Sequence, residues 1–99
     1  MANRKLMLTN ITESDGVTKK VAKPQQNFSY DVLLNQTFIE GYKTEIGCSA
    51  VFIPVSFDFE GGKNLRTSTV LEIELSEEDF VEKLIVKTMN TIYFFEIFV

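Results

Sequence analysis

The chain of 99 residues contains no histidine and only one cysteine. Histidine is the commonest general base near neutral pH and the commonest ligand of transition metals, so its absence argues against a zinc site and against most acid–base enzymes. Cys48 cannot form an internal disulfide, whereas small secreted domains usually contain several. Its context, EIGCSAV, lies at the entrance of an apolar segment, and we expect a buried structural thiol there.

Long apolar runs are also absent. No segment approaches the roughly 18 apolar residues of a membrane-spanning helix. The first ten residues, MANRKLMLTN, lack the apolar run of about seven or more residues that a signal peptide requires. We therefore expect one domain over residues 1–99, located in the cytoplasm, with no membrane contact and no cofactor.

Aromatic side chains are abundant for this length. Hydrophobic residues make up 44% of the chain and charged residues 24%, which is ordinary for a globular protein, but nine of the twelve aromatics are Phe. These rings must be buried in a core or in an interface.

Alternating patterns predict most of the chain to be strands. Residues 5–23 predict a hairpin around residues 13–16, where Asp15-Gly16 supplies the positive φ of a tight turn. A third strand is expected within residues 28–38. Residues 49–59 predict a strand with Val51, Ile53, Val55, Phe57 and Phe59 facing inward. Residues 60–64 are expected to form a turn into a strand over residues 66–75, with Thr69, Leu71, Ile73 and Leu75 inward and Glu72 and Glu74 in water.

Residues 76–89, SEEDFVEKLIVKTM, predict an α-helix. Ser76 is a suitable N-cap, and the acidic residues that follow it favour the positive end of a helix dipole. The apolar stripe of this helix consists of Phe80, Val81, Leu84 and Ile85, with Val86 on the polar side.

The last segment, residues 91–99, predicts a strand that is apolar on both faces, which is typical of a central strand. The helix would cover one face. The other face would be covered by the N-terminal hairpin, by curvature of the sheet towards a barrel, or by another copy of the protein. The expected fold class is α+β, an antiparallel sheet of five or six strands with a single helix near the C-terminus and a last strand after it.

Acidic residues are concentrated between positions 72 and 82, where six acids occur without a basic residue. We expect Glu72, Glu74, Glu78 and Glu82 to form an acidic edge. Such an edge keeps a Phe-rich chain soluble. Alternatively, it imitates nucleic-acid phosphates and occupies the basic groove of a nucleic-acid-handling protein.

No segment matches a catalytic or ligand-binding motif, so the sequence favours a non-enzymatic protein-binding or assembly module that does not bind nucleic acid directly. Its contacts are expected at the acidic edge and at an apolar surface, and the chain is expected to self-associate. The expected apolar contact residues are Phe52, Val86, Tyr93 and Phe95. The alternative is a small acidic inhibitor of a DNA- or RNA-handling enzyme, of the kind that phages and mobile elements carry.

Overall fold

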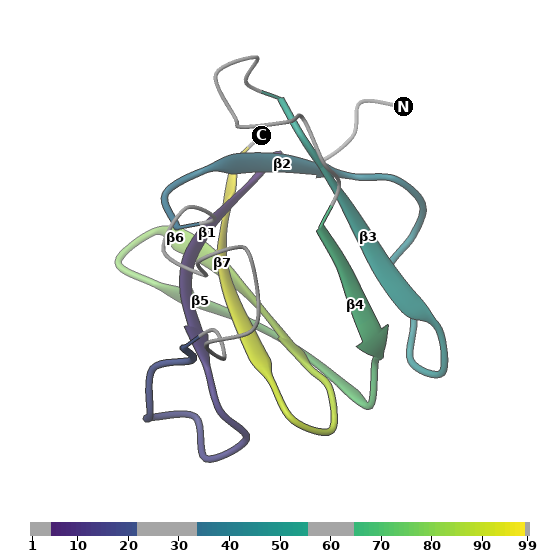
Figure 1. Ribbon diagram of the computed structural model, residues 1–99. Coiled ribbons are helices and arrows are strands. Elements are labelled where there is room, and N and C mark those ends of the chain that lie inside the picture. The colour runs from purple at the N-terminus through teal and green to yellow at the C-terminus, as the bar shows by residue number, and fades with distance from the viewer. Residues whose placement is uncertain (1–4, 22–33, 56–64, 99) are drawn as a thin grey trace.

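The computed structural model describes residues 5–21, 34–55 and 65–98, which form one antiparallel sheet of seven strands. The strands are β1 (Lys5–Thr12), β2 (Thr37–Glu40), β3 (Ser49–Pro54), β4 (Leu65–Thr69), β5 (Glu72–Glu78), β6 (Val81–Lys87) and β7 (Ile92–Phe98). Their order across the sheet is β4-β3-β2-β1-β7-β6-β5 (Figure 1). These ranges contain no helix, and hence none long and apolar enough to cross a membrane.

The sheet is strongly curled. In Figure 1, β3 and β4 lie on one side of the molecule, β1 and β7 lie on the other, and β2 crosses between them. Phe52 of β3 and Phe95 of β7 nevertheless touch, with ring centroids 4.7 Å apart. In a flat sheet these strands would be separated by three strand spacings, roughly 14 Å. The ring contact therefore crosses the interior of a barrel-like sheet.

Two consecutive residues join the two ends of the strand order. The backbone N–H of Val70 donates to the carbonyl of Cys48, beside β3, over 3.0 Å, and that of Leu71 donates to the carbonyl of Lys87 in β6 over 2.8 Å. Strands β4 and β5 are thus two halves of one bent strand, with Val70 fully buried at the bend. Among the described strands, β5 pairs with β6 alone, so its other edge is open.

The concave face of the sheet encloses the core. In β7, Tyr93, Phe95 and Ile97 point inward and are at most 9% exposed, while Phe94 and Glu96 alternate onto the outer face. The last strand lies between β1 and β6, which confirms its expected central position. The sequence left three ways to cover the second face of the last strand, and the structure shows one of them: curvature of the sheet covers the inner face of β7.

The expected helix over residues 76–89 is wrong, and so is the α+β fold class. This segment contains the end of β5, a two-residue turn and β6. Asp79 and Phe80 have φ values of 53° and 67°, which end any helix and reverse the chain. Burial then alternates along β6, where Leu84 and Val86 are 1% and 0% exposed. Val86, expected on a polar face, is a core residue.

The other strands are confirmed in part. The turn at residues 13–16 is present, with Gly16 at φ 77°, but among residues 17–21, the described part of the expected second strand, only Lys19 forms a β-bridge, to Thr12. The strand expected over residues 66–75 is broken by the bend at Val70, which leaves Leu71 and Leu75 exposed. Residues 28–33 and 56–64, which carry parts of two other predicted strands and a turn, lie outside the described residues.

The expected inward face of β3 is also wrong. Ala50 and Phe52 are fully buried, whereas Val51 and Ile53 are only partly buried. Both faces of this strand are apolar, so the alternation did not determine which face meets the core. The register shift between Ser49 and Val51 opposite β4 adds a local irregularity to the pairing.

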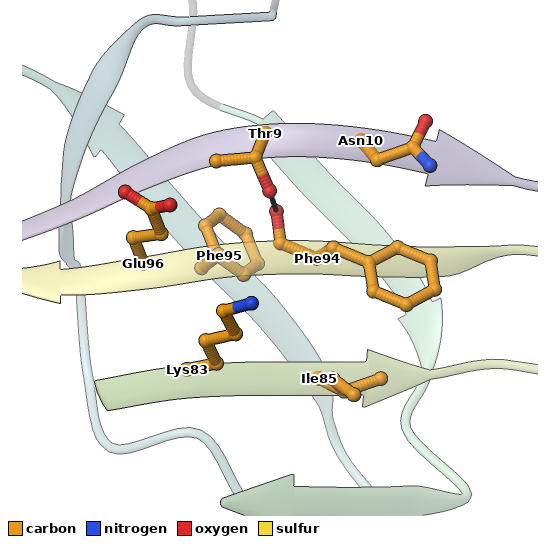
Figure 2. Close-up of a pocket in the computed structure, with 7 residues that line it drawn as sticks. All are labelled: Thr9, Asn10, Lys83, Ile85, Phe94, Phe95 and Glu96. Atoms are coloured by element: carbon orange, nitrogen blue, oxygen red, sulfur yellow. Dashed lines mark hydrogen bonds between the residues drawn. The ribbon is translucent and has the colours of Figure 1, made fainter. Parts of the chain in front are cut away.

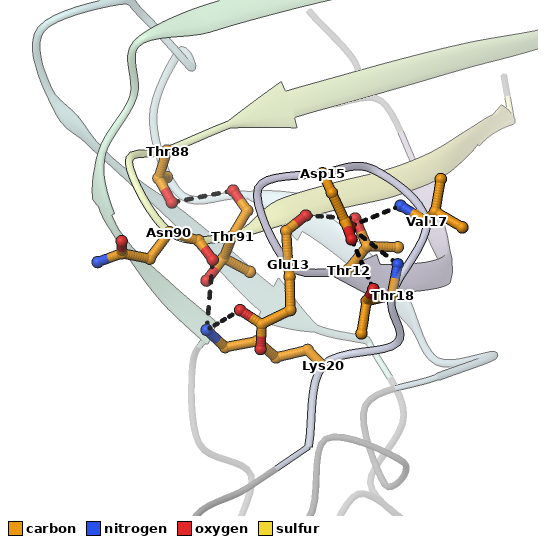
Figure 3. A network of polar contacts seen from close by, with 9 residues as sticks. All are labelled: Thr12, Glu13, Asp15, Val17, Thr18, Lys20, Thr88, Asn90 and Thr91. Atoms are coloured by element: carbon orange, nitrogen blue, oxygen red, sulfur yellow. Dashed lines mark hydrogen bonds and ion pairs between the residues drawn. The ribbon is translucent and has the colours of Figure 1, made fainter.

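A polar network attaches the turn after β1 to the turn before β7 (Figure 3). The ammonium of Lys20 lies 3.4 Å from a carboxylate oxygen of Glu13 and donates to the carbonyl of Asn90 over 3.3 Å. Within the first turn, the Thr18 hydroxyl and the backbone N–H groups of Val17 and Thr18 donate to Asp15. These donors, the hydroxyl first, lower the pKa of the Asp15 carboxyl.

Candidate functional site

The hairpin of β5 and β6 differs from the rest of the barrel because one of its two strands, β5, is almost entirely exposed. Every residue of β5 except Ile73 is exposed. Glu78 pairs with Val81, so the connection consists of Asp79 and Phe80 alone. Their positive φ values make this a type I′ turn.

Phe80 occupies the second turn position, where glycine is the favoured residue because it has no Cβ. A positive φ in a residue with a side chain costs about 1–2 kcal/mol. The Phe80 side chain is 97% exposed, more than any other large hydrophobic residue that the structure describes. Its ring therefore recovers none of this energy by packing within the described chain.

The register of the hairpin divides its carboxylates between two faces. Glu72, Glu74 and Glu78 lie on the outer face, opposite Lys87, Ile85 and Val81. Glu77 and Glu82 are directly opposite one another on the core-facing side, beyond the packed core. Like charges in this position repel. The four acids expected to share one edge are therefore split, with Glu82 separated from the other three.

Lysines of β6 pair with the outer-face acids. Lys87 lies 3.6 Å from Glu72 and 3.4 Å from Glu74, and Lys83 lies 3.2 Å from Glu78. These carboxylates remain about half exposed or more, so each ion pair contributes little to stability. For Glu77 and Glu82, no ion pair occurs within the described part of the chain. The negative field of the hairpin is thus concentrated near its tip.

The four residues expected to form an apolar contact surface lie inside the barrel. Phe52, Val86, Tyr93 and Phe95 are between 0% and 7% exposed and belong to one core cluster. A partner cannot reach them while the barrel is closed. The exposed apolar side chains are instead Leu75 and Phe80 of the hairpin, at 65% and 97%, and Leu71 just before it, at 54%.

An open hollow of about 230 Å³ lies on the outer face between β1, β6 and β7 (Figure 2). Its polar groups are largely occupied by bonds to neighbouring groups: the Thr9 hydroxyl donates to the carbonyl of Phe94 over 3.1 Å, and the Asn10 side-chain oxygen accepts from Ile11 N–H. Lys83 is paired with Glu78. The one hydroxyl of the lining, that of Thr9, is thus bonded to a backbone carbonyl and not to the Glu96 carboxylate, which also lines the hollow.

Other chemistry has little support in the described residues. Cys48 is exposed, so the expected buried thiol is wrong, because the residue precedes β3 in the loop rather than lying within the strand. Residues 5–21, 34–55 and 65–98 contain no cluster of three or more side chains able to hold a metal ion.

Comparison with protein-family models, with curated proteins and with solved structures gave no match to this chain. The site must therefore be interpreted from its own geometry.

Proposed function

We propose that the protein is a non-enzymatic binding module that attaches to a protein partner through the β5–β6 hairpin. Phe80 is the apolar anchor, and the carboxylates around it select a partner with a basic surface. The observation that carries this proposal is the 97% exposure of Phe80 in a left-handed backbone conformation.

A phenyl ring in water at a strained turn position has no benefit for folding, and strained residues of this kind cluster at functional sites. Aromatic side chains are also effective anchors, because they bury a large area while few rotatable bonds become fixed. A two-residue turn projects the ring clear of the strands. The hairpin therefore presents Phe80 as a side chain that can enter a pocket on another protein.

The charges near the tip specify what surrounds that pocket. Glu77, Asp79 and Glu82 flank Phe80 and are exposed. Desolvating them without a counter-charge is unfavourable, so the partner surface must supply Lys or Arg around its apolar pocket. Complementary charges of this type mainly accelerate association and select among partners.

The alternative function, an acidic inhibitor of a nucleic-acid-handling enzyme, requires a continuous row of unpaired charge. Lys83 and Lys87 lie among the outer-face carboxylates and reduce that charge. Self-association stays a prediction. Its motive, the second apolar face of β7, is now limited to outer-face residues such as Phe94 and Phe98, since Tyr93, Phe95 and Ile97 are buried in the chain's own core.

A photo-crosslinking amino acid at position 80 tests the proposal. Benzoylphenylalanine retains an aromatic ring there, and it should form a covalent adduct with the partner on illumination. The matched control carries the same amino acid in place of Met89. This residue is exposed too, at 72%, but lies in the turn between β6 and β7.

The expected result is an adduct from position 80 that excess unmodified protein suppresses and that position 89 does not give. Phe80→Gly protein in the same excess should fail to suppress it. Identical adducts from both positions, or none from position 80, would contradict the proposal.

A further inference from the structure

We propose that the open edge of β5 takes up an extended segment of the partner, with alternating basic and apolar residues, as an additional antiparallel strand. The inference rests on the proposed function, because the same hairpin supplies both the Phe80 anchor and the edge. It adds the chemistry of the partner segment.

The two-residue turn determines which backbone groups of β5 are free. Glu78 and Val81 close a type I′ hairpin and exchange hydrogen bonds, so every second residue from Glu78 towards Glu72 also bonds to β6. The N–H and C=O groups of Ile73, Leu75 and Glu77 consequently point towards the open edge. No partner for these groups occurs within residues 5–21, 34–55 and 65–98.

Charge is the main feature that protects this edge, since four of the seven residues of β5 are Glu. Strand β5 runs for seven residues, contains no proline, and pairs with β6 without a register shift. Pairing with a second copy is nevertheless unfavourable. An antiparallel pair centred on Leu75 would place Glu72 of each copy opposite Glu78 of the other, and like charges in that position repel. The charge of this edge therefore disfavours pairing with its own copy and favours a strand of opposite charge.

The two faces of β5 specify the alternation of the added strand. Residues opposite Ile73 and Leu75 would share the core-facing side, where Leu75 is 65% exposed, so apolar side chains fit there. Residues in between would lie beside Glu72, Glu74 and Glu78 on the outer face. Basic side chains there would place the carboxylates between two rows of positive charge, because Lys83 and Lys87 already lie on the β6 side.

When a peptide is added to a sheet edge as a strand, the backbone hydrogen bonds supply affinity and the side chains supply selectivity. The test uses a capped, fluorescently labelled eight-residue peptide of alternating Lys and Val, titrated with the full chain at low salt and followed by fluorescence polarisation. Replacing every Lys by Glu should weaken binding at least about tenfold, because the outer-face carboxylates then repel the peptide.

N-methylation provides the decisive comparison. In an antiparallel pair, the residues opposite Ile73, Leu75 and Glu77 exchange hydrogen bonds with them, and these are the valines. A peptide methylated on the backbone nitrogens of its valines should therefore bind at least about tenfold more weakly. A peptide methylated on the backbone nitrogens of its lysines should bind like the parent peptide. No binding of the parent peptide, or equal binding of the parent and the N-methyl-valine peptide, would overturn the inference.

Two variants of the protein give an independent measurement. Leu75→Pro removes an N–H that points to the open edge, whereas Leu75→Ala keeps the N–H and removes the side chain. The proline variant should lose peptide binding at least about tenfold more than the alanine variant. If the proline variant does not fold, the methylated peptides still decide the question. If the peptide fails while the adduct at position 80 persists, only the added strand is disproved; loss of the adduct disproves the proposed function.

Discussion

Replacing Phe95 by Ala is expected to lower the free energy of unfolding by about 3–5 kcal/mol. Phe95 is 1% exposed and packs against Phe52 across the barrel interior. It also lies opposite Leu8 on β1 and Leu84 on β6, both of them buried. Removal of the ring leaves a cavity where three parts of the sheet meet, and a closed core cannot collapse fully around it.

Phe94→Ala is the matched control, because it removes the same ring from the adjacent residue on the outer face. Phe94 is only partly buried, and the loss should stay below about 2 kcal/mol. Urea denaturation of both variants and of the wild type measures the difference, and Phe95→Leu provides a milder variant if the Ala variant is unfolded. Equal losses at positions 94 and 95 would show that the inward face of β7 is assigned incorrectly.

Replacing Phe80 by Gly is expected to change stability and binding in opposite directions. Glycine adopts a positive φ without strain, so the free energy of unfolding should rise by about 1 kcal/mol. Binding to the partner should weaken at least about 30-fold, because a central aromatic anchor typically contributes about 2 kcal/mol or more. Denaturation and the dissociation rate from the immobilised partner measure the two effects on one sample.

Phe80→Ala separates the effect of the backbone strain from the effect of the aromatic ring. Alanine keeps the Cβ and hence the strain at φ 67°, but it lacks the ring. It should therefore bind as poorly as the glycine variant without gaining its stability. Unchanged affinity in both variants would remove Phe80 from the binding site.

The sequence predicted the strands that carry clear alternation and turn signals, including the last strand and the turn at Asp15-Gly16. The prediction was wrong at residues 76–89 because these residues fit both the helical period of 3.6 and the strand period of two. The pattern of Ser76, the acids after it and the two lysines is typical of a helix, while Leu84 and Val86 also suit a strand buried on one face. Pairing with β5 and β7 decided between these patterns, and that pairing is a property of the whole sheet.

The missed turn has a more specific cause. Type I′ turns are recognised in a sequence by Asn, Asp or Gly followed by Gly, and Asp79-Phe80 has Phe where glycine is expected. Phe80 is therefore both the residue that kept the turn from being predicted and the most exposed large hydrophobic residue that the structure describes. The conflict between Phe80 and the turn preference is visible only once the hairpin is known, so the sequence alone carries no signal for this candidate site.

The sequence predicted the acidic residues of the candidate site as one edge, and their arrangement on the hairpin is different. Alternation along a strand separates Glu82 from Glu72, Glu74 and Glu78, and this separation follows only when the segment is treated as two strands. The four expected apolar contact residues lie in the core, since a curled sheet buries one face of each strand without help from a helix. Phe52 and Phe95 were therefore available to the core rather than to a partner.

Hydrogen–deuterium exchange of the free chain, and of its complex with a partner isolated by affinity to the unmodified protein, locates the binding surface. If the partner binds the β5–β6 hairpin, amide exchange in the complex should be slower over residues 72–82, most strongly at Ile73, Leu75 and Glu77, with β2, β3 and β4 unchanged. Protection confined to β2, β3 and β4, with exchange in the β5–β6 hairpin unaltered, would contradict this binding site.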